Sequence, residues 1–455
     1  SQRLRTGIKE EGGGMNSDQL RDKLSSSFIV FENELNGERR TPLHQKRRAA
    51  MERFEMKGFP STRDEEWKYT NLKPLLGTDY KIFHEGEQSL EFREIKRFFL
   101  NDIDTYKIVF VNGKYSSWLS ETTHRGFDIC TFSAALQRHR HVLDEYFGRS
   151  DEEPSSTMDL NTAFAQEGAF IRIGKNAHVD KPVEIVHFTT ADAGPSFNQP
   201  RNLIVLEEGS SAEVIERHRC LGEQETLTNA VSEVFLGAQA RLSLFRIQND
   251  APQAGLIDHT NIHLSRDAHA HTATFSMGGR FVRNDLAFFF NEPNATAQLD
   301  GLSLLDGGEF ADQHTLVDHR VPHCESREFY KGVYGGAAKG VFNGKVMVRP
   351  KAQKTNAFQE NKNLLLSEKA AVDTKPQLEI FADDVKCSHG CTVGQLDEEA
   401  LFYLRSRGIP EYESKALLLY AFGDEVIQRV PLKALRQRLH RLMAQKLDVD
   451  FQLNL

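Results

Sequence analysis

A series of similar short segments through the middle of the chain constrains the fold more than any other feature. Each segment has a turn-forming residue, two small or polar residues and a further small residue, and short β-type runs flank it. Their starts are spaced by 27 to 42 residues, and the last two copies are weaker. The segments are Gly174–Ala177, Gly209–Ala212, Gly237–Ala240, Asp267–Ala270, Asn294–Ala297, Gly336–Lys339 and Glu368–Ala371.

A period near thirty residues, with no helical stretch between copies, is typical of a solenoid. A doubly wound parallel sheet is excluded because no crossover helix fits between the strands. Leucine-rich repeats are excluded because their Leu-x-x-Leu-x-Leu register is missing. The pattern therefore predicts a mainly β protein whose core is a right-handed parallel β-helix. A β-sandwich is the alternative, since irregular strand spacing also fits that fold.

Helical patterns lie on both sides of the predicted solenoid. Apolar residues recur every three or four positions from Asp18 to Lys57, and Gly58 followed by Pro60 ends that region. After Val393 the helical period returns, and Asp397 is the expected N-cap of the first helix there.

These changes of pattern divide the chain. We predict an N-terminal helical region with a connecting segment at residues 15–150, the β-helix at 151–393 and a C-terminal helical region at 394–455. Residues 1–14 end in three glycines immediately before Met15. We expect them to be a vector-derived remnant and exclude them from the fold; the alternative is a processed targeting peptide, which the segment's composition does not favour.

Composition limits the classes of partner. The net charge of −8 argues against nucleic acid as the main partner. No apolar run approaches the length of a membrane span, and the mean hydropathy is −0.50, so we expect no membrane partner. Five cysteines without framework spacing suit a reducing compartment, which predicts a cytoplasmic protein.

The stretch from Lys386 to Thr392 carries the most distinctive chemistry. Cys387, His389 and Cys391 occupy alternate positions, so in a strand all three side chains share one face. Thiolate and imidazole bind zinc, iron and iron–sulfur clusters, but three such residues do not complete a closed site. We interpret them as half of a site that needs ligands from elsewhere. The alternative is that the cysteines are small hydrophobic core residues.

Other motifs are less specific. There is no Gly-x-x-x-x-Gly-Lys-Ser/Thr loop for nucleotide hydrolysis and no Gly-x-Ser-x-Gly elbow. Histidines gather in two places, and we interpret them as structural because no full metal-ligand set accompanies them. They are His259, His263, His269 and His271 in one group and His314, His319 and His323 in the other.

Three segments resemble a known family. Phe381–Val393 and the following Gln395–Ile409 resemble the C-terminal signature of the SufB/SufD family of iron–sulfur cluster assembly proteins. Gly58–Thr70 resembles the N-terminal motif of that family, and Lys354–Ser367 matches the segment that joins them. The sequence Cys-Ser-His-Gly-Cys-Thr at 387–392 favours the SufD branch, because the SufB branch typically has Gly-His-Glu-Ala-Thr there.

The resemblance implies a non-catalytic subunit, not an enzyme, of the SufB–SufC–SufD scaffold complex. Such a subunit pairs with SufB and binds the ATPase SufC. Cys387 and His389 match family positions that face SufB, which implies a metal site shared across that interface. No tightly bound cofactor is implied, but a transient iron–sulfur cluster or iron ion at the SufB interface is. Cys391 stands where the family often has alanine.

Two further expectations concern association. We expect the isolated chain to form a homodimer through the strand edge at Lys386–Thr392. We also expect Asp397–Leu447 to bind SufC through an exposed surface that includes Tyr403, Tyr412 and Tyr420. The competing function is a carbohydrate-active enzyme of the polysaccharide lyase type, because such enzymes also use parallel β-helices. That function needs clustered carboxylates on one sheet face and a signal peptide, and neither is evident in the sequence.

Overall fold

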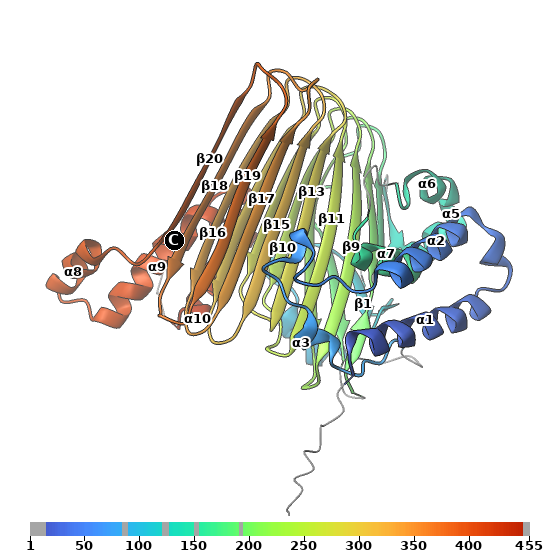
Figure 1. Ribbon diagram of the computed structural model, residues 1–455, viewed down its shortest axis with the longest axis horizontal. Coiled ribbons are helices and arrows are strands. Elements are labelled where there is room, and N and C mark those ends of the chain that lie inside the picture. The colour runs from blue at the N-terminus through green and yellow to red at the C-terminus, as the bar shows by residue number, and fades with distance from the viewer. Residues whose placement is uncertain (1–14, 84–89, 121–126, 150–153, 191–193, 449–455) are drawn as a thin grey trace, which may run out of the picture.

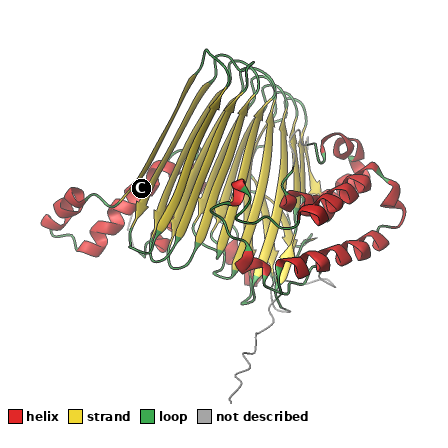
Figure 2. Cartoon of the chain, in the orientation of Figure 1, coloured by secondary structure: helices red, strands yellow, loops and turns green. Residues whose placement is uncertain are grey.

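The computed structural model describes residues 15–83, 90–120, 127–149, 154–190 and 194–448. The expected remnant at residues 1–14 lies outside the described residues, as do residues 449–455. A slab of long strands forms the centre of the molecule, and helices lie at its two ends (Figures 1 and 2). The prediction of a mainly β protein with helical terminal regions is confirmed.

The region before the long strands is mostly helical. Its α-helices are α1 (Ser17–Glu34), α2 (Pro42–Lys57), α3 (Lys73–Leu76), α4 (Phe92–Ile95), α5 (Phe132–Arg138), α6 (Arg140–Tyr146) and α7 (Ser156–Ala163). Short 3₁₀ helices lie at Asn36–Arg40, Glu65–Trp67 and Lys96–Phe98. The same region contributes strands β1 (Tyr106–Val111), β2 (Lys114–Tyr115) and β3 (Phe127–Thr131). The sheets therefore already include strands from the segment predicted to be connecting.

The remaining strands follow one another with few interruptions. They are β4 (Ala169–Ile173), β5 (Val183–Thr189), β6 (Ser196–Asn198), β7 (Arg201–Leu206), β8 (Ser211–Cys220), β9 (Thr226–Leu236), β10 (Arg241–Gln248), β11 (Ala254–Leu264) and β12 (His269–Ser276). They continue with β13 (Phe281–Phe290), β14 (Thr296–Leu305), β15 (Phe310–His319), β16 (Glu325–Tyr334), β17 (Lys339–Val348), β18 (Asn356–Leu365), β19 (Ala371–Ile380) and β20 (Lys386–Gly394).

The strands alternate between two sheets. Sheet I has the order β2-β1-β5-β8-β10-β12-β14-β16-β18-β20, and sheet II has the order β19-β17-β15-β13-β11-β9-β7-β4-β3. From β7 onward, each strand pairs in parallel with the strand one coil away, so each coil gives one strand to each sheet. This arrangement is the predicted β-solenoid. The sandwich alternative is wrong, because a sandwich is built from antiparallel pairs.

The corners from sheet II to sheet I share a backbone requirement. Every such corner except the last, between β19 and β20, has one residue with positive φ, a conformation that suits glycine and asparagine best. These residues are Asn176, Gly209, Gln239, Asp267, Asn294, His323 and Lys354. The repeat segments found in the sequence coincide with these corners only as far as Asn294, because His323 and Lys354 are not typical turn residues. The last two segments, at Gly336 and Glu368, lie at the opposite corner.

The space between the sheets is partly apolar and partly polar. Apolar side chains such as Leu244, Ile262 and Phe288 form a core that runs through many coils. Polar side chains lie beside it and satisfy one another: the Asn284 amide hydrogen-bonds to Gln248 at 2.6 Å and to Gln313 at 3.1 Å. Buried polar groups persist in a fold when they find such partners.

The C-terminal helices are α8 (Glu398–Ser406), α9 (Glu411–Ile427) and α10 (Lys433–Lys446). Asp397 caps α8 as predicted, accepting hydrogen bonds from the backbone N–H groups of Glu399 and Ala400. Helices α9 and α10 pack on the outer face of sheet I, where Leu435 and Leu439 are fully buried. Helix α8 buries no residue and projects from the end of the slab (Figure 1).

Part of the N-terminal region, including α1 and α2, covers the outer face of sheet II, whereas Leu100 and Ile103 pack on sheet I. Leu20 and Phe54 from its helices pack with Leu227 and Ile257 of the sheet. Trp67 is 4% exposed, and the Arg283 guanidinium lies 3.7 Å from the centre of its ring. Among the described residues, no helix combines the length and the apolar character needed to cross a bilayer.

Candidate functional site: the open end of the solenoid

The Lys386–Thr392 motif forms most of β20, the last strand of sheet I. On its outer side β20 meets no further strand of the described chain, so this end of the solenoid is open (Figure 1). Most of β20 is exposed, whereas the two strands directly before it, β18 and β19, are mostly buried or partly buried. The motif therefore lies at the edge of a sheet, where backbone groups are available for pairing.

Cys387, His389 and Cys391 share one face of β20, as predicted. They stand in register with Ala357, Gln359 and Asn361 of β18. Because Ala357 belongs to the core between the sheets, these three positions continue the inner face of the solenoid. Cys387 is partly buried against that core, whereas His389 is exposed.

The two cysteines have different surroundings. Burial raises the pKa of the Cys387 thiol, and a backbone hydrogen bond at Ala357 only partly offsets this effect. The thiol is therefore mainly protonated at neutral pH. Cys391 instead lies among polar groups: its Sγ is 3.0 Å from the Thr374 hydroxyl and 3.9 Å from Asn361 Oδ1.

A polar layer lies directly behind these residues. Glu328 is 3% exposed and accepts hydrogen bonds from Thr315 at 2.5 Å and from the Gln359 amide at 2.6 Å. Burial raises its pKa to about 7, against the opposing effect of the two hydrogen bonds. Glu328 forms no ion pair with any described residue. A carboxyl group thus lies two strands inward from His389.

Glu328 and Gln359 were not predicted from the sequence. The signal was available, because Glu328, Gln359 and His389 follow one another at spacings of 31 and 30 residues, which match the period of the solenoid. The repeat pattern is weaker after Asn294, so the sequence did not show that these three residues occupy equivalent positions in successive coils.

The motif alone does not complete a metal site. In the part of the chain that the structure describes, no three histidine, cysteine or carboxylate side chains are placed to hold a metal ion. Cys387 and His389 offer two ligands, whereas tetrahedral zinc and cluster irons require four. The donor types fit iron and iron–sulfur clusters, but the remaining ligands have to come from another chain or from solvent.

The two histidine groups are built into the scaffold. Each of the following has a hydrogen-bonding, ion-pairing or stacking partner within the fold: His259 with Asp285, His263 with Phe235, His269 with Thr296, His271 with Asp300, His314 with Glu66 and His319 with Ser326. His323 lies at a corner with φ of 63°. This agrees with their interpretation as structural residues.

A charged network not recognised in the sequence holds the N-terminal loop on sheet II. Arg283 pairs with Asp285 at 2.8 Å and with Asp312 at 2.9 Å, and it donates to the backbone carbonyl of Glu66 at 2.9 Å. His314 Nε2 lies 2.6 Å from the Glu66 carboxylate. Trp67 also stacks on Arg283. Together these contacts anchor the Glu65–Thr70 segment to sheet II.

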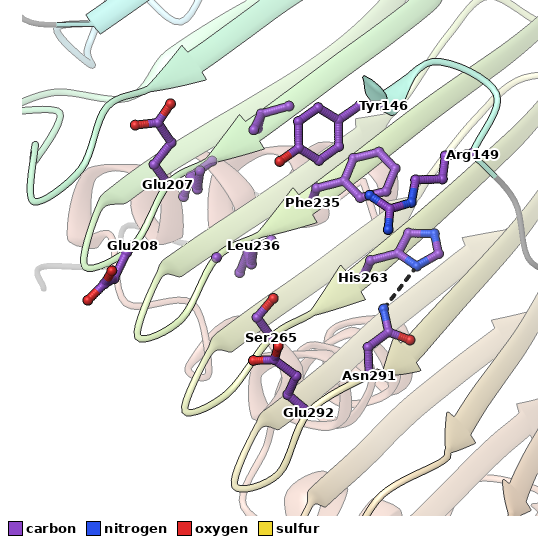
Figure 3. Close-up of a pocket in the computed structure, with 13 residues that line it drawn as sticks. Tyr146, Arg149, Glu207, Glu208, Phe235, Leu236, His263, Ser265, Asn291 and Glu292 are labelled. Carbon is purple, nitrogen blue, oxygen red and sulfur yellow. Dashed lines mark hydrogen bonds between the residues drawn. The ribbon is translucent and has the colours of Figure 1, made fainter. Parts of the chain in front are cut away.

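A cavity of about 420 Å³ lies elsewhere, on the outer face of sheet II (Figure 3). Tyr146 and Phe235 contact each other there with ring centres 4.8 Å apart, and Phe235 stacks on His263 at the same distance. The Asn291 amide lies 3.4 Å from the His263 ring. None of the residues predicted from the sequence to bind metal lines this cavity.

Apolar side chains are exposed at the open end and on α8. At the open end Phe381 is 60% exposed and Val393 is 48% exposed. On α8, Phe402 and Tyr403 are 72% and 55% exposed. The expectation for Tyr420 is wrong: its ring is half-buried, 5.6 Å from the His440 ring of α10.

Comparison with known proteins places the chain in a family. Residues 187–422 match the family described as SUF system FeS cluster assembly, SufBD core domain, and residues 19–185 match the SufBD protein N-terminal region. An iron–sulfur cluster assembly SufBD family protein of Synechocystis is 32% identical over 412 residues, covering 88% of this chain and 90% of that protein. The iron–sulfur cluster assembly protein SufD of Escherichia coli is 31% identical over 418 residues, covering 91% of this chain and 95% of SufD. The protein of the same name from Bacillus subtilis is 28% identical, covering 85% of this chain and 89% of its own length. The chain therefore belongs to the SufBD family of iron–sulfur cluster assembly proteins.

Proposed function

We propose that this chain is the SufD-type, non-catalytic subunit of a cytoplasmic SufB–SufC–SufD scaffold complex. The observation that carries the proposal is the open end of the solenoid. There Cys387 and His389 lie on an exposed edge strand as an incomplete ligand pair. A partner strand paired with β20 would bring further ligands to the same face, because parallel or antiparallel addition keeps the alternation of side chains.

In this proposal SufB is the partner at the open end. The cluster or iron ion held between the two chains is cargo, built there and passed on, and this chain retains no cofactor of its own. Cys387 supplies a thiolate and His389 an imidazole. Phe381 and Val393, exposed beside them, supply the apolar contact that excludes water from the interface.

SufC is the second partner, and its binding surface is α8 with the start of α9. Phe402, Tyr403 and Tyr412 are exposed there. Aromatic residues of this kind are enriched at protein interfaces.

The test is co-purification of an affinity-tagged chain expressed with SufB and SufC, followed by reconstitution with iron and sulfide. Recovery of both partners and a cluster absorbance band are expected. Recovery of neither partner, or cleavage of a polysaccharide by the purified chain, would contradict the assembly role and favour the carbohydrate-active alternative.

A further inference from the structure

One side chain behind the metal-ligand pair has an unused hydrogen-bond acceptor. Gln359 is 3% exposed, and its Oε1 atom has no hydrogen-bond partner among the described residues. A buried amide oxygen without a donor is destabilising by about 1–3 kcal/mol, so such atoms are rare and call for an explanation. The residue directly across from Gln359 in register on β20 is His389.

The orientation of the Gln359 amide is fixed from behind. Its Nε2 donates to Glu328 Oε2 at 2.6 Å, and Thr315 donates to Glu328 Oε1 at 2.5 Å. Both Glu328 oxygens accept hydrogen bonds in this arrangement, so the amide nitrogen faces Glu328 and the amide oxygen faces away.

The facing sheet leaves room for this amide. Gly344 lies on β17, and a Cβ atom at that position would be 2.3 Å from Gln359 Nε2. Any larger residue would displace the amide. The position of the Gln359 side chain is therefore defined by two features. Gly344 leaves space for the amide, and Glu328 holds the amide by a hydrogen bond.

We propose that Gln359 is a positioning residue for His389: its Oε1 accepts a hydrogen bond from one ring nitrogen of His389, and Thr315 and Glu328 hold the amide in the orientation that this bond requires. Adjacent strands are about 4.8 Å apart, so a glutamine and a histidine in register on the same face are within reach of each other. The bond fixes one neutral tautomer of His389 and leaves the other ring nitrogen for the metal. Histidine ligands in metal sites usually donate their second ring N–H to such an acceptor. The inference rests on the proposed role of His389 as a ligand.

The first experiment observes the hydrogen bond directly in the full chain. Histidine ring nitrogens are labelled with ¹⁵N, and the signals of His389 are identified by their loss in His389→Ala. In the wild type we expect two well-separated ring-nitrogen shifts, typical of one tautomer. Gln359→Met, which keeps the length but removes the acceptor, should bring the shifts together. Gln248→Met, the same change at a buried interior glutamine far from the open end, should leave them unchanged. Shifts that are equal in the wild type, or unaffected by Gln359→Met, would overturn the proposal.

The second experiment measures the rate of cluster formation in the reconstituted complex. Gln359→Met should lower the rate by about 10-fold, the lower end for groups that orient a metal ligand. Because Gln359 acts through His389, adding Gln359→Met to His389→Ala should cause no further loss. Losses that multiply in the double variant would contradict a positioning role.

The two experiments separate the two claims. If His389→Ala forms clusters at the wild-type rate, the proposed function of His389 fails, while the NMR result still decides whether the hydrogen bond exists. If Gln359→Met does not fold, Thr315→Val provides the same test, because it removes the hydroxyl that holds Glu328.

Discussion

At the residue scale, His314 connects the N-terminal loop to the solenoid through its charge. Its Nε2 atom lies 2.6 Å from Glu66, and its Nδ1 atom lies 3.7 Å from Asp312. Burial and the nearby Arg283 cation lower the pKa of His314, but the two carboxylates outweigh them and raise it to about 9. The imidazolium therefore persists at neutral pH in the folded chain.

This raised pKa predicts a loss of stability at alkaline pH. A histidine whose pKa is higher in the folded chain than the unfolded value of about 6.5 stabilises the fold fully below that value, and the stabilisation is lost as the pH rises through about 9. The urea midpoint should therefore fall between pH 7 and pH 9.5. His314→Gln should remove most of this dependence, whereas His178→Gln, at an exposed position, should keep it. An equal slope in wild type and His314→Gln would contradict the assignment.

At the scale of elements, the C-terminal helices divide into two groups. Helices α9 and α10 cover sheet I and bury Leu435, Leu439 and Met443, whereas α8 buries nothing. Removing every residue after Leu396 would therefore expose the outer face of sheet I as well as abolish a partner surface. Substitutions on α8 separate these two effects.

We expect Phe402→Asp combined with Tyr403→Ser to abolish recovery of SufC without changing the thermal unfolding temperature. Exposed substitutions of this kind usually change stability by less than about 0.5 kcal/mol. Leu439→Ala on α10 is the matched control: its side chain is fully buried, so the cavity should cost about 2–5 kcal/mol while SufC binding by the folded fraction persists. Undiminished SufC recovery by the α8 variant would place the SufC surface elsewhere.

At the scale of the whole molecule, the open end predicts self-association when SufB is absent. An exposed edge strand beside Phe381 and Val393 favours a two-fold contact with a second copy. Light scattering of the isolated chain at micromolar concentration should give the mass of a dimer. Val393→Lys should shift it toward the monomer, and Met56→Lys, at a site 78% exposed on α2, should not. A monomeric wild type at this concentration would contradict the prediction.

The solenoid could be predicted because its corners recur in the sequence. Gly209, Asp267 and Asn294 are residues that favour turns, and positive φ occurs at each of these positions. The corners at His323 and Lys354 were not predicted, because these residues have positive φ in the fold but are not residue types that usually form turns. Tertiary context decides the backbone at those two corners.

The candidate site could be predicted only in part. The alternation of Cys387, His389 and Cys391 indicated a shared face, because strand geometry depends on local sequence alone. Glu328 and Gln359 lie on other strands, and their approach to His389 depends on how the coils stack. The anchor of Trp67 on Arg283 joins residues more than two hundred positions apart, and no local pattern predicts such a contact.

The role of the open end in cluster assembly is measured most directly by cluster absorbance in the reconstituted complex with Cys387→Ser, His389→Ala and Cys391→Ala. All three positions lie on β20 and are exposed or partly buried, so each variant should fold and bind SufC. We expect a clear loss of cluster with Cys387→Ser and with His389→Ala, because each variant removes a proposed ligand that SufB would not replace. We expect a smaller loss with Cys391→Ala, whose thiol contacts Thr374 within its own chain. Wild-type cluster yield from both Cys387→Ser and His389→Ala would show that the open end is not the site of cluster assembly.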